Sequence, residues 1–179
     1  MRFIITGLEK LGWGYIDKTG EIVINFQFSN AERFYEGLAA ISIGKYPHDR
    51  WGYIDKTGKI VIAPQFDGAD PFSEGLAVVK LGKFFEGDDE RYGYIDKTGK
   101  YVITPQFDGA RKFKEGLAAV GIGKYPLAKW GYIDKTGKYV INPQFDEVGW
   151  KFSEGLARVK RDGKYGYIDK TGTMLEIKR

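Results

Sequence analysis

Few residues of this sequence could act on a substrate. Its single histidine, His48, stands beside Asp49, and such a pair could act in acid–base catalysis. No nucleophile is identifiable near this pair, and the chain has no cysteine, so metal sites built on thiolates or on several histidines are excluded within one chain. Glycine-rich phosphate loops and the nucleophile-elbow motif are also missing. We therefore expect no catalytic residue, no metal site and no cofactor, and a protein that is not an enzyme.

A row of carboxylates is the second candidate for chemistry. Aspartates followed by a lysine recur at one position of a repeated pattern, at Asp17, Asp55, Asp96, Asp134 and Asp169. Calcium needs several oxygens converging on one loop, whereas each of these loops offers one carboxylate. We therefore favour turn-forming aspartates over a calcium or acid–base site. The adjacent lysines are interpreted as solvated turn residues, with an anion-attracting stripe as the alternative.

These aspartates belong to an octet, aromatic-Gly-Tyr-Ile-Asp-Lys-Thr-Gly. The octet begins at Trp13, Trp51, Tyr92, Trp130 and Tyr165. A second shared stretch follows the first four octets and contains the blocks PQFD and EGLA in copies two to four, as in VITPQFDGARKFKEGLAAV from Val102. The first copy has Phe26 where the others have proline. Identity at so many positions predicts an array of tandem repeats.

The sequence closely resembles the WG-repeat proteins, a mostly bacterial group. The residues that carry the resemblance are Trp13-Gly14, Trp51-Gly52 and Trp130-Gly131, each followed by YIDKTG, with the PQFD and EGLA blocks downstream. Tyrosine replaces the tryptophan at Tyr92 and Tyr165. The resemblance covers nearly the whole chain and implies a β-rich repeat array. It implies no shared catalytic motif and no settled activity.

Each repeat is predicted to contain three strands, which we name A, B and C. In the fourth copy, A spans 130–134 and B spans 139–141, joined by a turn in which Asp134 accepts a backbone hydrogen bond and Gly137 takes positive φ. Pro143 marks the end of strand B or an unpaired edge. The segment from Phe145 to Phe152 is expected to form a helical turn or loop, and strand C spans 155–159.

The order of these strands along the chain is C, four times ABC, then AB. We expect one continuous all-β domain divided as an N-terminal half-repeat at 1–12, repeats at 13–50, 51–91, 92–129 and 130–164, and a C-terminal half-repeat at 165–179. An open, curved β-solenoid capped by half-repeats is favoured. In the alternative, the first C strand joins the last A and B strands and closes a five-fold, propeller-like ring.

Residues identical in every repeat are explained by the geometry of the repeat itself. The octet aromatics Trp13, Trp51, Tyr92, Trp130 and Tyr165 are therefore predicted to form a buried ladder between repeats, rather than stacking platforms for sugars or bases. The recurring glutamates of the EGLA blocks are predicted to bond the backbone of a neighbouring turn.

Positions that differ between repeats are the binding candidates. They gather in the connections from strand C to strand A, at 46–50, 84–91, 125–128 and 161–164, which we name the C-to-A loops. Our candidates for contact with a partner are the loop residues together with the one tryptophan found only in repeat four: Tyr46, His48, Arg50, Phe84, Phe85, Arg91, Tyr125, Leu127 and Trp150.

The favoured function is a non-enzymatic scaffold that binds another protein through the C-to-A loops. The alternatives are a carbohydrate or cell-envelope binding module, and a small anionic ligand held by lysines in the centre of a closed ring. With a net charge of +4, nucleic acid is not the expected partner. Head-to-tail self-association through complementary ends is a further option. No membrane span and no signal peptide are evident, and the sequence indicates no compartment.

Overall fold

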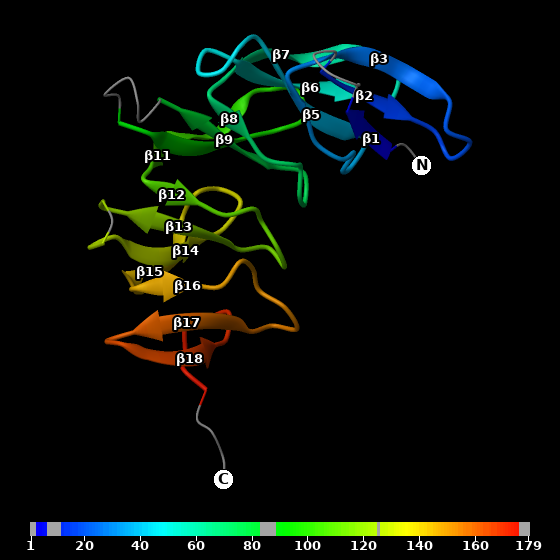
Figure 1. Cartoon of the computed structure of the whole chain (residues 1–179). Helices are drawn as coiled ribbons and strands as arrows, with labels where there is room; N and C mark the ends of the chain where they lie inside the picture. The colour runs from blue at the N-terminus through cyan, green and yellow to red at the C-terminus, as the bar shows by residue number, and fades with distance from the viewer. Residues whose placement is uncertain (1–2, 7–11, 83–88, 125, 176–179) are drawn as a thin grey trace.

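Strands and tight turns make up the protein. The computed structural model in Figure 1 describes residues 3–6, 12–82, 89–124 and 126–175, and within these ranges there is no helix. The all-β prediction is confirmed. The described residues also contain no helix that is long and apolar enough to cross a membrane.

The strands form five small antiparallel sheets, numbered here along the chain. Sheet 1 contains β1 (Phe3–Thr6), β2 (Trp13–Ile16) and β3 (Ile22–Phe28). Sheet 2 contains β4 (Asn30–Ala31), β5 (Leu38–Ile43), β6 (Arg50–Asp55) and β7 (Ile60–Phe66). Sheet 3 contains β8 (Gly68–Ala69), β9 (Ala77–Leu81), β10 (Arg91–Ile95) and β11 (Tyr101–Phe107). Sheet 4 contains β12 (Gly109–Ala110), β13 (Ala118–Ile122), β14 (Lys129–Ile133) and β15 (Tyr139–Phe145), and sheet 5 contains β16 (Glu147–Val148), β17 (Ala157–Arg161) and β18 (Lys164–Ile168).

The sheets are offset from the sequence repeats. Sheets 1 to 4 each join strand C of one repeat to strands A and B of the next, as β13 pairs with β14 and β14 pairs with β15, whereas sheet 5 joins strand C to strand A. The N-terminal strand β1 accordingly pairs with β2, and β18 pairs with β17. Figure 1 shows the sheets following one another along an arc, with the N and C ends at its two extremes.

The turn between strands A and B has the predicted geometry. One carboxylate oxygen of Asp134 accepts hydrogen bonds from the backbone N–H of Thr136 at 2.9 Å, from its hydroxyl at 2.6 Å, and from the N–H of Lys138 at 3.1 Å. Gly137 closes the turn at φ +89°, a conformation that glycine adopts without a Cβ clash. The other four octets carry the same aspartate–threonine bonds. The interpretation of these aspartates as turn formers is confirmed.

The glycine after the octet aromatic is required by a bulge in strand B. Trp130 lies opposite Phe145 and Tyr132 lies opposite Ile141, so strand B has extra residues opposite Gly131. A Cβ on Gly131 would stand 2.5 Å from the carbonyl oxygen of Ile141, well inside van der Waals contact. The strand does not end at Pro143 but runs through it at the edge of the sheet, where a missing N–H costs no ladder bond.

The segment 145–152, predicted as a helical turn or loop, contains the short strand β16 and then a loop at 149–152, so the loop is confirmed in part and the strand was not predicted. A hairpin follows the segment in every repeat. In repeat three, β12 pairs with strand C, and Lys114 then bridges Leu117 across a two-residue turn. Both turn residues have positive φ, 54° at Glu115 and 86° at Gly116. Such a turn favours asparagine or aspartate before glycine, and a left-handed glutamate costs about 1–2 kcal/mol. Another interaction must therefore account for a glutamate in every copy.

That interaction is a ladder of glutamates from sheet to sheet. The Glu74 carboxylate accepts a hydrogen bond from the N–H of Gly116 at 2.9 Å and lies 3.4 Å from Nζ of Lys135. Glu36 and Glu115 make the equivalent contacts with Gly75 and Lys97 and with Gly155 and Lys170. The predicted role of the glutamates is confirmed for Glu36, Glu74 and Glu115, and no such bond is found for Glu154 within the described residues. Three of the octet lysines are thereby ion-paired between sheets.

Consecutive sheets pack face to face and share four apolar clusters. The cluster between sheets 4 and 5 contains Tyr132 and Ile141 from one sheet and Val159 and Ile168 from the other. The fully buried aromatic of each octet is the tyrosine two positions after its first residue, at Tyr15, Tyr53, Tyr94 and Tyr132. Burial raises the pKa of these tyrosines, so that each hydroxyl remains a hydrogen-bond donor.

The octet aromatics are predicted to form a buried ladder between repeats, but none of the five is fully buried. Trp13, Trp51, Tyr92 and Trp130 are half-buried at the border of the clusters. Tyr165 is 53% exposed, and so is Tyr167, which corresponds to the buried tyrosines. The physical reason is that, among the described residues, no further sheet packs on this face of sheet 5.

Replacing Gly131 with alanine should destabilise the fold. The added Cβ meets backbone on the bulged strand, which cannot move without breaking sheet pairing, and we expect a loss of about 1–3 kcal/mol in the free energy of unfolding. Urea denaturation followed by circular dichroism measures this. The matched control is Gly68→Ala, where the Cβ meets no backbone atom but only Cε and Cβ of Lys80, at 3.3 and 3.4 Å, and the change should stay within about 0.5 kcal/mol. Equal effects at the two positions would contradict the argument.

Acid should weaken the octet turns. Hydrogen bonds from Thr136 hold the pKa of Asp134 below its usual value, and the same holds for the other four octet aspartates. Their contribution is therefore present above the ordinary pKa of about 3.9 and lost as the pH falls through the folded-state value. We expect the stability difference between wild type and Asp134→Asn, measured by urea titrations from pH 7 to pH 2, to shrink below pH 4. A difference that stays constant over this range would refute the role of the ionised carboxylate.

Candidate functional site

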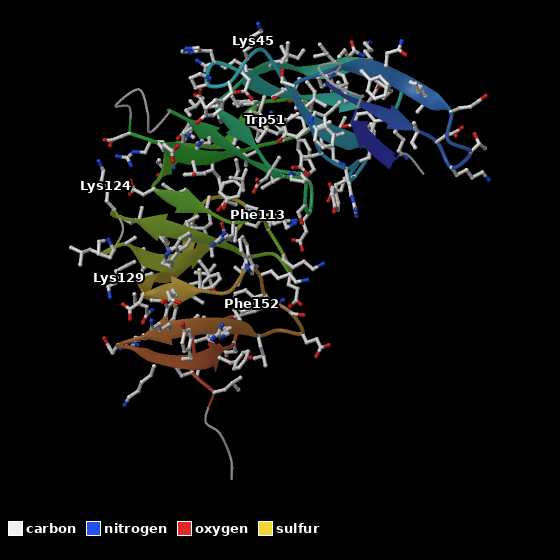
Figure 2. All side chains as sticks on the ribbon, viewed as in Figure 1. Lys45, Trp51, Phe113, Lys124, Lys129 and Phe152 are labelled. Atoms are coloured by element: carbon white, nitrogen blue, oxygen red, sulfur yellow. The ribbon has the colours of Figure 1, made fainter. Side chains whose placement is uncertain are left out.

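The predicted loop candidates that the structure describes are exposed. Tyr46 is 77% exposed on the loop between β5 and β6, and Leu127 is 82% exposed on the loop between β13 and β14. His48 is also exposed beside Tyr46. Figure 2 places Lys45, Lys124 and Lys129, which flank these loops, along the outer edge of the arc. The candidates Phe84, Phe85 and Tyr125 lie outside the described residues.

Two further candidates, Arg50 and Arg91, belong to the architecture of the repeats. Arg50 forms an ion pair with Asp67, and Arg91 forms one with Asp108. These aspartates end the PQFD blocks, and Lys129 pairs with the corresponding Asp146 in the next repeat. The ion pair recurs in three repeats, so Arg50 and Arg91 each have a structural role within their sheet.

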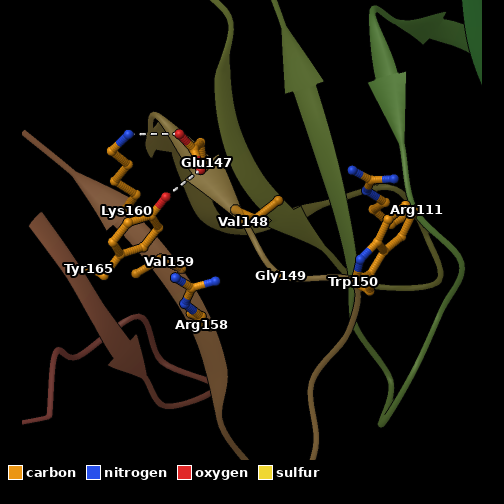
Figure 3. Close-up of a pocket in the computed structure, with 9 residues that line it drawn as sticks. All are labelled: Arg111, Glu147, Val148, Gly149, Trp150, Arg158, Val159, Lys160 and Tyr165. Atoms are coloured by element: carbon orange, nitrogen blue, oxygen red, sulfur yellow. Dashed lines mark hydrogen bonds and ion pairs between the residues drawn. The ribbon is translucent and has the colours of Figure 1, made fainter. Parts of the chain in front are cut away.

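Trp150, the remaining candidate, lines a pocket of about 190 Å³ at the C-terminal end of the stack. Figure 3 shows this pocket, which we name the β16 pocket. Trp150 is 75% exposed. The pocket is lined by Arg111, Glu147, Val148, Gly149, Trp150, Arg158, Val159, Lys160 and Tyr165.

Aromatic rings hold the two arginines of the β16 pocket. The guanidinium carbon of Arg111 lies 4.0 Å from the ring centre of Trp150 and 5.4 Å from that of Trp130. Arg158 lies 4.0 Å from the ring centre of Tyr165. Stacking of this kind contributes about 0.5–1 kcal/mol at an exposed site and restricts the orientation of the guanidinium plane.

The lysine of the pocket is neutralised locally. Lys160 donates to the Glu147 carboxylate at 2.7 Å, and the Tyr165 hydroxyl donates to the same carboxylate at 3.0 Å. The bond with Lys160 lowers the pKa of Glu147 and raises the pKa of Lys160, so both are charged at neutral pH. No hydrogen bond or ion pair joins the guanidinium of Arg111 or Arg158 to another side chain in the part of the chain that the structure describes. The pocket therefore carries net positive charge.

Residues of the β16 pocket depart from the repeat pattern. Arg158 occupies the strand-C position held by Ala40, Val78 and Ala119, which all pack inside the clusters. In the last sheet this position faces outward, so a charged residue can be accommodated there.

An extra residue creates the loop that carries Trp150. The segment from Phe145 to Phe152 is one residue longer than the equivalent segment from Phe107 to Phe113. In the first three repeats the buried tyrosine hydroxyl donates to a carbonyl of this segment, but the Tyr132 hydroxyl finds no partner. Tyr132 Oη and Arg111 Nε are the two buried side-chain polar atoms without a hydrogen bond in the described ranges. Both residues contact the lengthened segment: the Tyr132 ring packs against Phe152, and the Arg111 guanidinium lies over Trp150.

Sequence reasoning identified Trp150 but missed the residues around it. Glu147, Arg158 and Lys160 lie on paired strands of sheet 5, whereas Arg111 follows β12 of sheet 4, so their proximity depends on strand pairing and on the stacking of these two sheets. The sequence does carry one signal for this site, because the spacing from Phe145 to Phe152 is one residue longer than the equivalent spacing from Phe107 to Phe113. Within the described residues, no group of three or more histidine, cysteine, aspartate or glutamate side chains is arranged to hold a metal ion.

Substituting Trp150 should change the fluorescence of the protein while leaving its stability nearly unchanged. Trp150 is exposed, whereas Trp13, Trp51 and Trp130 are half-buried. In Trp150→Phe we expect a blue-shifted emission and clearly weaker quenching by acrylamide, with a loss of stability below about 1 kcal/mol. The control Trp51→Phe should keep the quenchable component. If both variants are quenched alike, the exposure of Trp150 is not as described.

Comparison with known proteins bears on the fold and family. A search of curated proteins found no match. The crystal structure of puromycin hydrolase is similar at a TM-score of 0.49 and 12% sequence identity, over 94% of this chain and 34% of that chain. The chain thus spans about a third of that protein. The family described as "WG containing repeat" matches residues 13–46, 51–83, 92–125 and 130–165. Since these matches cover most of its length, the chain belongs to the family of proteins built from WG-containing repeats.

Proposed function

We propose that this protein is a non-enzymatic scaffold that binds another protein through its variable C-to-A loops. The observation that carries the proposal is the exposure of large apolar side chains where the repeats differ. Tyr46 and Leu127 are more than three quarters exposed, while the repeated tyrosines are buried. Exposed apolar and aromatic side chains supply the anchors of protein interfaces.

The arrangement of the loops supports a shared surface. Strands C and A are neighbours in every sheet, so their connections leave each sheet at the same end. Because the sheets are stacked, these ends follow one another along the outer edge of the arc in Figure 2. A row of loops on a regular framework suits contact with an extended partner surface.

The other two functions have less support. Carbohydrate binding was motivated by the tandem octet aromatics, but the first four of these pack against the apolar clusters. An anion in the centre of a ring requires the two ends to meet, and here β1 and β18 pair within sheets at opposite ends of the arc. A protein partner is therefore the better supported proposal.

The test is partner capture with a loop variant. The purified chain carrying Tyr46→Ala and Leu127→Ala should capture its partner from cell extract at least tenfold less efficiently than wild type, by quantitative mass spectrometry. The substitutions remove exposed apolar anchors and should leave the urea midpoint unchanged.

A matched control carries Lys18→Ala and Lys56→Ala. These lysines lie in octet turns at the opposite end of strand A, and the control should retain the partner. Capture that is identical for wild type, control and loop variant would count against the C-to-A loops as the binding surface.

A further inference from the structure

We propose that the β16 pocket binds an acidic peptide segment, with carboxylates of the peptide paired with Arg158 and with Arg111. The proposal rests on the proposed function in taking a protein as partner, and it assigns a second contact site, distinct from the C-to-A loops, with a stated chemistry. Arg158, Trp150 and Glu147 depart from the repeat pattern, and the fold brings them together with Lys160 around one pocket.

The two arginines differ from the other basic residues that repeat architecture explains. Arg50, Arg91 and Lys129 each have an aspartate partner, and Lys97, Lys135 and Lys170 each have a glutamate partner. Arg111 and Arg158 have aromatic partners, and their guanidinium groups make no hydrogen bond to a described side chain. Each still acts on a carboxylate through space: Arg111 opposes the rise that burial causes in the pKa of Asp70, and Arg158 helps to lower the pKa of Glu147. A stacked guanidinium retains its in-plane N–H donors, which match the two oxygens of a carboxylate.

The burial of part of the Arg111 side chain also favours an anion beside it. Nε of Arg111 is buried and has no hydrogen-bond partner in the described part of the chain. A buried donor without a partner is unfavourable by roughly 1–3 kcal/mol, and more when the group is charged. An anion beside Arg111 would offset this cost by attraction to the charged guanidinium.

The remaining lining favours a peptide over a polyanion. Val148, Trp150 and Tyr165 supply apolar surface between the charged groups. Glu147 places a carboxylate in the same pocket, which repels a chain of closely spaced phosphates. A pocket of about 190 Å³ accommodates an acidic side chain and part of an apolar neighbour. These features fit a segment in which aspartate or glutamate alternates with apolar residues.

The outward face of sheet 5 extends the contact surface. Tyr165 and Tyr167 alternate with Gly166 on β18 and are both about half exposed. Arg158 and Lys160 lie opposite them on β17. A peptide whose acid reaches the pocket can therefore place its next apolar side chain against an exposed tyrosine.

The test uses the purified chain and capped, fluorescein-labelled octapeptides. One peptide alternates glutamate and phenylalanine, and its matched control replaces every glutamate with glutamine. By fluorescence anisotropy we expect the acidic peptide to bind at least tenfold more tightly than the glutamine peptide. We expect Arg158→Ala and Arg111→Met each to weaken binding of the acidic peptide at least tenfold.

The variants are chosen so that loss of folding does not explain the result. Alanine is the residue that repeats one and three carry at the position of Arg158, and circular dichroism and urea midpoints verify each protein. Arg161→Ala removes the same charge from the same strand outside the pocket, and it should change affinity less than twofold.

Several outcomes would overturn the assignment. Equal binding of the acidic and glutamine peptides would do so, as would an effect of Arg161→Ala equal to that of Arg158→Ala. Tighter binding of a phosphoserine peptide or of oligouridylate would replace the carboxylate with a phosphate ligand. Because this assay needs no natural partner, its failure leaves the loop-variant capture result standing, and failure of that capture leaves the peptide affinity standing.

Discussion

Burial of one sheet face by the next sheet is the constraint on which this structure depends. A three- or four-stranded sheet of this size exposes apolar side chains on both faces, and each repeat contributes residues to two neighbouring clusters. The buried octet tyrosines take part in this packing with both ends of the side chain. Their rings are enclosed between sheets, and three of the four hydroxyls donate a hydrogen bond to a backbone carbonyl. Stability is therefore shared between repeats rather than contained in any one of them.

The polar contacts between sheets explain why strained residues are kept. Glu36, Glu74, Glu115 and Glu154 all have positive φ, which glutamate rarely adopts. The carboxylates of the first three accept a hydrogen bond from the hairpin of the next sheet and lie beside the octet lysine of that sheet. A backbone that is unfavourable locally is thus compensated by bonds to the neighbouring sheet, and the same hairpin must recur wherever another sheet follows.

Local geometry was predictable from the sequence, and long-range pairing was not. Asp134 and Gly137 define their turn through contacts within a few residues, so their roles could be read from residue type and order. The grouping of strands could not, since strand C can be assigned to the repeat that contains it or to the next one until pairing is seen. Tyr165 was misplaced for a related reason, because its exposure depends on the absence of a following sheet. Trp150 was found as an exception, but its neighbours Arg111 and Arg158 required the stack.

The end of such an array is where variation is physically tolerated. Inside the stack, Ala40, Val78 and Ala119 are enclosed between sheets, and a larger charged residue there would separate them. At Arg158 that restriction is lifted, because the side chain faces outward and lies over Tyr165. The inserted residue before Phe152 is accommodated at the expense of one tyrosine hydrogen bond. A sheet face that no described sheet covers can therefore carry charge and exposed aromatics without weakening the packing between the sheets, and this freedom is the physical basis of the peptide site that we propose.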